Sequence, residues 1–125
     1  MRRVVGERTV AAGDVLLMAL PFHTPKGHEQ EGKRPVVVVG CPSGTLRYPT
    51  LIVVPLTTQV GRWARQNPTM YPSLSPGEGG LPRSSVALLD QLRSIDVRRI
   101  EGYLGTLRQD TLNRIRAGIM RLFEP

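Results

Sequence analysis

Short apolar runs alternate with polar connections rich in Gly and Pro along the chain, and this pattern predicts a strand-rich fold. The runs are too short for typical core helices, and most have a Gly or Pro close by. The expected core strands cover residues 15–20, 36–39, 51–56 and 86–89. Apolar positions between 95 and 107 mark one or two further strands, and the first of these alternates with charged residues as a half-exposed strand does.

One helix is expected at the C-terminus. Apolar residues recur there at helical spacing, at Leu112, Ile115, Ile119, Leu122 and Phe123. Thr106 followed by Gln109 fits a capping box at the start of this helix. We expect the apolar stripe to pack on the sheet and the arginines on the other faces to be solvated.

The segment between residues 61 and 83 is rich in Pro, Gly and Ser and is too long for a tight hairpin. It is expected to be a functional or mobile excursion, with a short helical turn at 62–65. Trp63 lies in this segment between arginines. It either stacks on a base, anchors the segment or contacts a protein partner.

Composition narrows the class of protein. With 125 residues the chain is expected to form a single domain, 1–125, and its net charge of +7 attracts nucleic acid, an anionic membrane surface or an acidic protein. No apolar run approaches the roughly 20 residues of a membrane span, which argues against a membrane protein. One cysteine, Cys41, and the lack of a charged-then-apolar leader favour the cytoplasm.

A polar, charge-dense loop, Gly27–Pro35, runs directly into the apolar run 36–39. It carries two cationic groups, two carboxylates and an imidazole beside a rigid strand. Such an arrangement is typical of a site that handles phosphate groups on a firm scaffold.

Four motifs occur in one order along the chain: Gly13–Val15, then Gly27–Gln30 with Lys33–Val38, then Pro55–Gln59, and finally Ser85–Asp96. On these motifs the chain resembles the MazF/PemK family of toxin endoribonucleases over about residues 12–123. The resemblance implies an α+β, mainly β fold, an SH3-like small barrel of mostly antiparallel strands with a C-terminal helix, assembled as a homodimer. It also implies sequence-specific cleavage of single-stranded RNA without a metal or other cofactor, restrained by a cognate acidic antitoxin.

The residues of the second and third motifs suit that chemistry. When the 2′-hydroxyl attacks the adjacent phosphate, the reaction needs a base, an acid and donors for the charge on phosphorus. Arg34 can bind the phosphate oxygens bidentately and Thr57 can donate a hydrogen bond to the same group. These two fall on the family's catalytic Arg and Thr, and Glu29 on an acidic position near the site. The group that accepts the 2′-proton stays unassigned.

Further candidates for binding the substrate lie around these three. They are Lys33, His28, Gln59, Asp90, Arg93 and Trp63. Each has a structural alternative: Asp90 and Arg93 form an ion pair instead, or Gln59 only closes a turn. His23 and His28 also allow an acid/base pair of imidazoles, although the family commonly carries serine at position 28.

Two other functions stay open on sequence alone. One is a CcdB-like gyrase poison, which acts through a terminal Trp-Gly-Ile, whereas the sequence here reads Leu122–Pro125. The other is a small barrel that binds RNA without cutting it, because basic charge and strands serve binding equally well.

Overall fold

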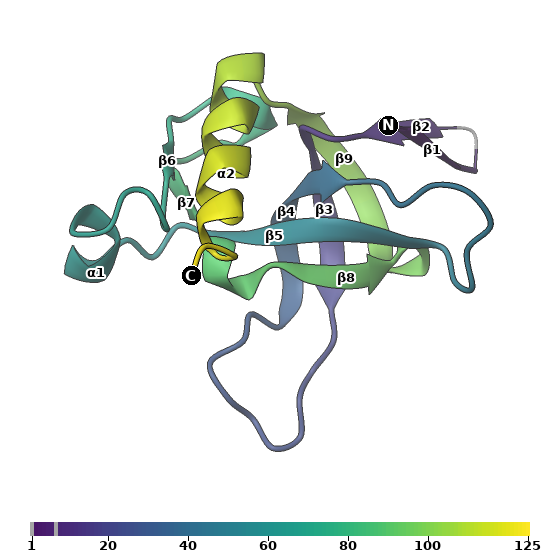
Figure 1. Cartoon of the computed structure of the whole chain (residues 1–125), viewed down its shortest axis with the longest axis horizontal. Coiled ribbons are helices and arrows are strands. Elements are labelled where there is room, and N and C mark those ends of the chain that lie inside the picture. Colours follow the sequence, from purple (N-terminus) through teal and green to yellow (C-terminus); the bar gives the residue numbers. More distant parts are fainter. Residues whose placement is uncertain (1, 7) are drawn as a thin grey trace.

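The computed structural model describes residues 2–6 and 8–125 and consists mainly of strands, with one long helix at the C-terminal end (Figure 1). The strands are β1 (Arg2–Val5), β2 (Arg8–Ala11), β3 (Asp14–Leu20), β4 (Gly32–Gly40), β5 (Thr50–Thr57), β6 (Ser73–Leu74), β7 (Ser85–Ala87), β8 (Arg93–Asp96) and β9 (Ile100–Thr106). The helices are α1 (Arg62–Arg65) and α2 (Gln109–Arg121), with 3₁₀ turns η1 (Glu78–Gly80), η2 (Leu89–Gln91) and η3 (Val97–Arg99).

Seven of the described strands form one curled sheet in the order β6-β7-β5-β4-β3-β9, and β8 also pairs with β5. All of its pairings are antiparallel. β1 and β2 form a separate hairpin, and α2 lies across one face of the curl (Figure 1). The expected α+β, mainly β architecture with a C-terminal helix is confirmed.

Both faces of the central strands are buried, which explains why their sequences are continuous apolar runs. Alternate side chains of a strand point to opposite faces, so β3 sends Leu16 and Met18 into the core inside the curl and Val15 into a second core. Leu89 of η2 and Ile115 of α2 also belong to the second core. The helical stripe predicted from the sequence therefore packs on the sheet as expected.

Two details at the ends of these elements differ from the sequence predictions. The capping box was wrong, because Thr106 ends β9 and its hydroxyl donates to the buried carboxylate of Asp14 at 2.9 Å. α2 starts after Arg108 instead. The run 86–89 is a strand only as far as Ala87, and Leu89 already begins a 3₁₀ turn.

Part of the segment 61–83 packs against the sheet. Its helical turn forms at the predicted residues, and Leu74 and Leu81 are buried in the second core. η1 touches β9 backbone to backbone: a Cβ on Gly80 would lie 2.0 Å from the Leu104 carbonyl oxygen. Only glycine permits this approach, since Gly80 also has a φ of +76°.

No helix in the described part of the chain is long and apolar enough to cross a membrane.

Candidate functional site

A hollow of about 320 Å³ opens where four segments meet beside the end of β5. The loop between β3 and β4, the end of β5, the segment around α1 and the turn η2 each contribute to its wall. The lining residues are His28, Gln30, Thr57, Gln59, Trp63, Tyr71, Leu88, Asp90 and Gln91. The hollow therefore gathers five residues predicted from the sequence: His28, Thr57, Gln59, Trp63 and Asp90.

Sheet pairing brings these segments together. β7 pairs with the end of β5, with Thr57 opposite Val86, and the Leu88 N–H then donates to the Pro55 carbonyl at 3.0 Å. The turn η2 that follows therefore starts beside Pro55, and its Asp90 and Gln91 line the hollow with Thr57. The neighbouring strand β4 follows the loop that carries His28 and Gln30. The wall of the hollow is thus fixed by strand register on one side and by the conformation of this loop on the other.

Arg34 and Thr57 lie near each other on the neighbouring strands β4 and β5. The pairing of these strands ends at Val36 and Pro55, and the same register continued by two residues brings Arg34 opposite Thr57. Both side chains line one smaller hollow of about 70 Å³. Because Thr57 also lines the larger hollow, it joins the two.

The polar atoms of this pair are already oriented. Arg34 Nε donates to the carbonyl oxygen of Glu31 at 3.0 Å, while its exposed guanidinium leaves the Nη groups as donors for a ligand. Thr57 Oγ1 accepts from the backbone N–H of Gln59 at 3.1 Å, and the hydroxyl can still donate its own hydrogen to a ligand. Both residues can therefore donate hydrogen bonds to one phosphate group.

Asp90 is held from the side of the α1 segment. The Tyr71 hydroxyl donates to Asp90 Oδ2 at 2.6 Å, and this hydrogen bond raises the pKa of the phenol. The Trp63 ring packs edge-on against Tyr71, with centroids 4.9 Å apart, and stays 44% exposed. Asp90 therefore pairs with Tyr71 and not with Arg93, the ion pair that the sequence left open.

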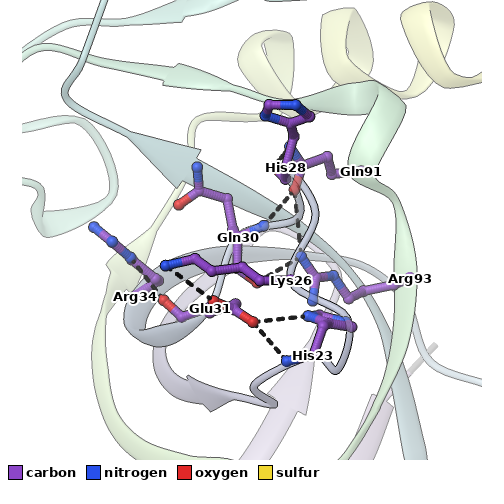
Figure 2. Close-up of polar contacts among 8 residues, drawn as sticks. All are labelled: His23, Lys26, His28, Gln30, Glu31, Arg34, Gln91 and Arg93. Atoms are coloured by element: carbon purple, nitrogen blue, oxygen red, sulfur yellow. Dashed lines mark hydrogen bonds and ion pairs between the residues drawn. The ribbon is translucent and has the colours of Figure 1, made fainter.

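Two residues that follow β7 hold residues 28–30 of the β3–β4 loop, which we call its inner limb. Gln91 Oε1 accepts from the Gln30 N–H at 2.7 Å, and Gln91 Nε2 donates to the His28 carbonyl at 3.2 Å. Arg93 donates to the Gln30 carbonyl at 3.0 Å (Figure 2). Burial lowers the pKa of the Arg93 guanidinium, and these contacts show its role in the fold as a clamp on the loop.

Glu31 holds residues 23–26 of the same loop, which we call its outer limb. Its carboxylate accepts from the His23 backbone N–H and lies 3.3 Å from His23 Nδ1 and 3.9 Å from Lys26 Nζ (Figure 2). The His23 backbone hydrogen bond is the largest influence that lowers the pKa of Glu31, with smaller contributions from the His23 side chain and Lys26. His23 is thus engaged by Glu31 rather than paired with His28.

Two predicted residues lie away from the pair Arg34 and Thr57. Glu29 lines a neighbouring hollow of about 270 Å³ with His23 and Arg93, a hollow that shares Asp90 and Gln91 with the larger one. Lys33 alternates with Arg34 along β4 and forms an ion pair of 3.3 Å with Glu101 on β9.

Within the described residues, no group of three His, Cys, Asp or Glu side chains lies close enough to hold a metal ion.

Known proteins share the fold of this chain. The family of PemK-like, MazF-like toxins of type II toxin-antitoxin systems matches residues 11–123. The chain belongs to this toxin family. The resemblance drawn from the four motifs is confirmed.

Individual members of the toxin family are similar over most of the chain. Endoribonuclease EndoA of Bacillus subtilis (strain 168) is 33% identical over 89 residues, or 71% of this chain and 74% of that protein. The MazF (Form-I) crystal structure from Deinococcus radiodurans has a TM-score of 0.63 at 26% identity, covering 89% of this chain and 93% of that one. The MazE-MazF (Form-II) structure from the same organism has a TM-score of 0.60 at 26% identity, covering 89% and 92%.

Sequence reasoning missed several residues of the site in this toxin-family chain. Gln30, Tyr71, Leu88 and Gln91 line the hollow, and Glu31 closes the loop. Gln91 stands inside a motif that carries the resemblance, between Asp90 and Arg93, so its position was a usable signal. The signal for Tyr71 was only its aromatic ring, which could stack on a base, because the folding of the segment 61–83 is what brings it beside Asp90.

Proposed function

We propose that this chain is an endoribonuclease that cuts single-stranded RNA, mRNA included, at specific sequences and thereby inhibits translation and growth. The observation that carries the proposal is that Arg34 and Thr57 line one hollow and that Thr57 also lines the larger one beside it. Family membership and the relative named Endoribonuclease EndoA support the same activity. The net charge of +7 favours a polyanionic substrate.

In the proposed reaction the 2′-oxygen attacks the adjacent phosphorus while the bond from phosphorus to the 5′-oxygen breaks. The products are a 2′,3′-cyclic phosphate and a 5′-hydroxyl, with one proton lost from the 2′-hydroxyl and one gained by the leaving oxygen. Arg34 and Thr57 stabilise the charge that develops on the non-bridging oxygens. Donors fixed before the reaction contribute most, because they need no reorganisation as charge develops.

Two side chains compete for the role of proton acceptor. Glu29 lines the neighbouring hollow, so it reaches a 2′-hydroxyl near Thr57 only if its part of the loop moves. His28 already lines the hollow with Thr57. We compare Glu29→Gln with His28→Gln: the base is the residue whose substitution lowers kcat and removes the acidic limb of the pH–rate profile.

The other residues around the hollow are proposed to bind the RNA. Trp63 offers an exposed ring for base stacking, and Gln59 and Asp90 present polar atoms to base edges. Arg93 acts from the neighbouring hollow, and Lys33 would meet only RNA that extends toward β9.

The proposal is tested by incubating purified protein with a long single-stranded RNA and an all-deoxy copy, both in EDTA. We expect the RNA to be cut to cyclic-phosphate and 5′-hydroxyl ends and the DNA to be spared. Equal cutting of the DNA, or activity that returns only with magnesium, would refute the mechanism. RNA binding without any cutting would favour the non-catalytic barrel.

The partners are proposed on the same grounds. A type II toxin has a cognate antitoxin, and a surface of net charge +7 suits an acidic, extended segment laid over the RNA site. A MazF relative was solved as a MazE-MazF complex, which supports such a partner. We also propose a homodimer, as the family resemblance implies, to be tested by light scattering at micromolar protein, where a monomer would contradict it.

A further inference from the structure

Three hydrogen bonds tie the inner limb of the β3–β4 loop to residues more than sixty positions away. Gln91 accepts from the Gln30 N–H and donates to the His28 carbonyl, and Arg93 donates to the Gln30 carbonyl (Figure 2). Every one of these contacts ends on the backbone of the loop. They therefore fix where the loop runs, whatever its side chains do.

A glutamine is well suited to this contact. Its amide carries an acceptor and two donors, so one side chain can satisfy both an N–H and a carbonyl, much as a neighbouring strand would. Gln91 is half-buried, and leaving these backbone groups unpaired would carry a desolvation cost. Gln91 Oε1 also lies 3.4 Å from the guanidinium of Arg93, which joins the two clamping side chains to each other.

The clamp continues into the proposed catalytic pair. Residue 31 follows the clamped Gln30, and the Glu31 carbonyl accepts from Arg34 Nε at 3.0 Å. An exposed arginine otherwise samples many rotamers, and this contact fixes the plane of the guanidinium. The positions of the Arg34 Nη groups therefore depend on the loop backbone that Gln91 and Arg93 hold.

We infer that Gln91 and Arg93 are positioning residues for RNA cleavage, which act through the backbone of residues 28–31 to aim the Arg34 guanidinium at the phosphate. The inference rests on the proposed function. A donor that waits in its reactive orientation avoids the cost of being ordered during the reaction.

A second set of contacts separates positioning from folding of the loop. The outer limb is closed by the Glu31 carboxylate on His23 and Lys26, and none of these contacts involves Gln91. Removing the Gln91 amide therefore leaves the outer closure in place. The expected result is a folded loop whose inner limb is held only by the hydrogen bond from Arg93 to the Gln30 carbonyl.

The test is a double-mutant cycle that joins Gln91 to Arg34. In the otherwise native protein, we expect Gln91→Ala to lower kcat about tenfold with a smaller change in KM. In the Arg34→Ala background the same substitution should lower kcat less than about threefold, because the group that it aims is gone. A residue that mattered only for stability would lower kcat by the same factor in both backgrounds.

A conservative variant provides an independent measurement. Gln91→Glu keeps an oxygen that accepts from Gln30 and loses the donor to His28, so we expect a loss of kcat smaller than that of Gln91→Ala, about threefold. Gln109→Ala is the matched control, since that amide donates to Asn113 within α2, and it should leave kcat unchanged in both backgrounds. Thermal unfolding of every variant shows which are folded. If Gln91→Ala fails to fold, the Gln91→Glu cycle carries the test.

Two results would overturn the inference: unchanged kcat in folded Gln91 variants, or an equal loss with and without Arg34. Failure of the proposed function has a different signature, since native protein would then not cut RNA at all.

Discussion

The Tyr71 hydroxyl and the Asp90 carboxylate are 2.6 Å apart, and this hydrogen bond joins the segment 61–83 to the turn η2 across the candidate site. The two residues lie 19 positions apart in sequence and line the same hollow. Asp90 thus presents its carboxylate to the hollow in an orientation set by a neighbour.

This contact predicts how Tyr71 titrates. The Asp90 hydrogen bond raises the pKa of Tyr71 above its ordinary value near 10.0, so Asp90→Ala should lower it again. Near-UV absorbance of phenolate measures the titration, and the spectrum of Tyr71→Phe identifies which transition belongs to Tyr71. Because the folded-state pKa is the raised one, the stability that this contact gives is complete below pH 10 and is lost as pH rises through the raised pKa. Identical titration with and without Asp90 would contradict the contact.

Substitution of the proposed catalytic pair should lower the cleavage rate strongly. Arg34→Ala and Thr57→Ala each remove a donor to the transition state, which costs about 3 kcal/mol, or about a hundredfold in kcat. Arg47→Ala is the control for charge, because Arg47 stacks near the Tyr48 ring outside both hollows. Near-native rates in both folded variants would show that other residues perform the reaction.

Acid pH should weaken the contacts by which the Glu31 carboxylate holds the β3–β4 loop. The pKa of Glu31 lies below its ordinary value of 4.5, chiefly because the carboxylate accepts from the His23 backbone. The stability that Glu31 contributes is therefore present above pH 4.5 and is lost as pH falls through the lowered folded-state pKa. In urea unfolding we expect Glu31→Gln to be less stable than the native protein at neutral pH, with the difference shrinking in acid. A difference that stays constant with pH would rule out this role for the carboxylate.

Alanine substitutions at two glycines with positive φ, Gly77 and Gly80, should show the cost of backbone strain alone and of strain with a steric clash. Gly77 has φ +89° with open space around it, whereas a Cβ on Gly80 would lie 2.0 Å from the Leu104 carbonyl. We expect Gly77→Ala to cost about 1 kcal/mol in the free energy of unfolding, from the left-handed backbone alone. Gly80→Ala should cost at least about 3 kcal/mol, because β9 or η1 must also move. Equal costs in denaturant unfolding would mean that η1 is not held against β9.

The proposed antitoxin and RNA should compete for one surface. Trp63, the single tryptophan, lines the hollow, so its fluorescence should change when either ligand binds. We expect an RNA with a 2′-O-methyl group at the cleavage site to displace the acidic segment of the antitoxin. Antitoxin binding should also weaken as salt rises, since part of the attraction is screened charge. Simultaneous binding of both ligands at one hollow, or binding that does not depend on salt, would contradict the arrangement.

The sequence predicted the sheet well where burial repeats along a strand. Val36 and Val38 point into one core and Val37 into the other, so β4 was recognisable as an apolar run. The hairpin of β1 and β2 was missed, because only Val10 of its described residues is fully buried. Thr106 looked like a helix cap because a local pattern does not reveal Asp14, which lies 92 positions away and takes the hydroxyl.

The candidate site was likewise predicted from the sequence only in part. Arg34 and Thr57 were identified from motifs, and the structure places them along one hollow, while their catalytic role stays a prediction. Gln91, in contrast, contacts the backbone of residues 61 and 63 positions away, and its proposed role depends on these contacts. Backbone contacts do not constrain which side chains the loop carries, so they leave no pattern in the sequence of the loop.

Because Gln91 and Arg93 follow the proposed catalytic pair in the chain, the site can form only late in the order of synthesis of these residues. Arg34 and Thr57 leave the ribosome before the residues that complete the hollow and hold the loop, which follow β7 as far as Arg93. β3 must also wait for its second neighbour, β9, which ends at Thr106. A growing chain thus carries the proposed catalytic pair before it can hold the pair in place, so the residues up to Thr106 must be synthesised before the proposed cleavage can begin.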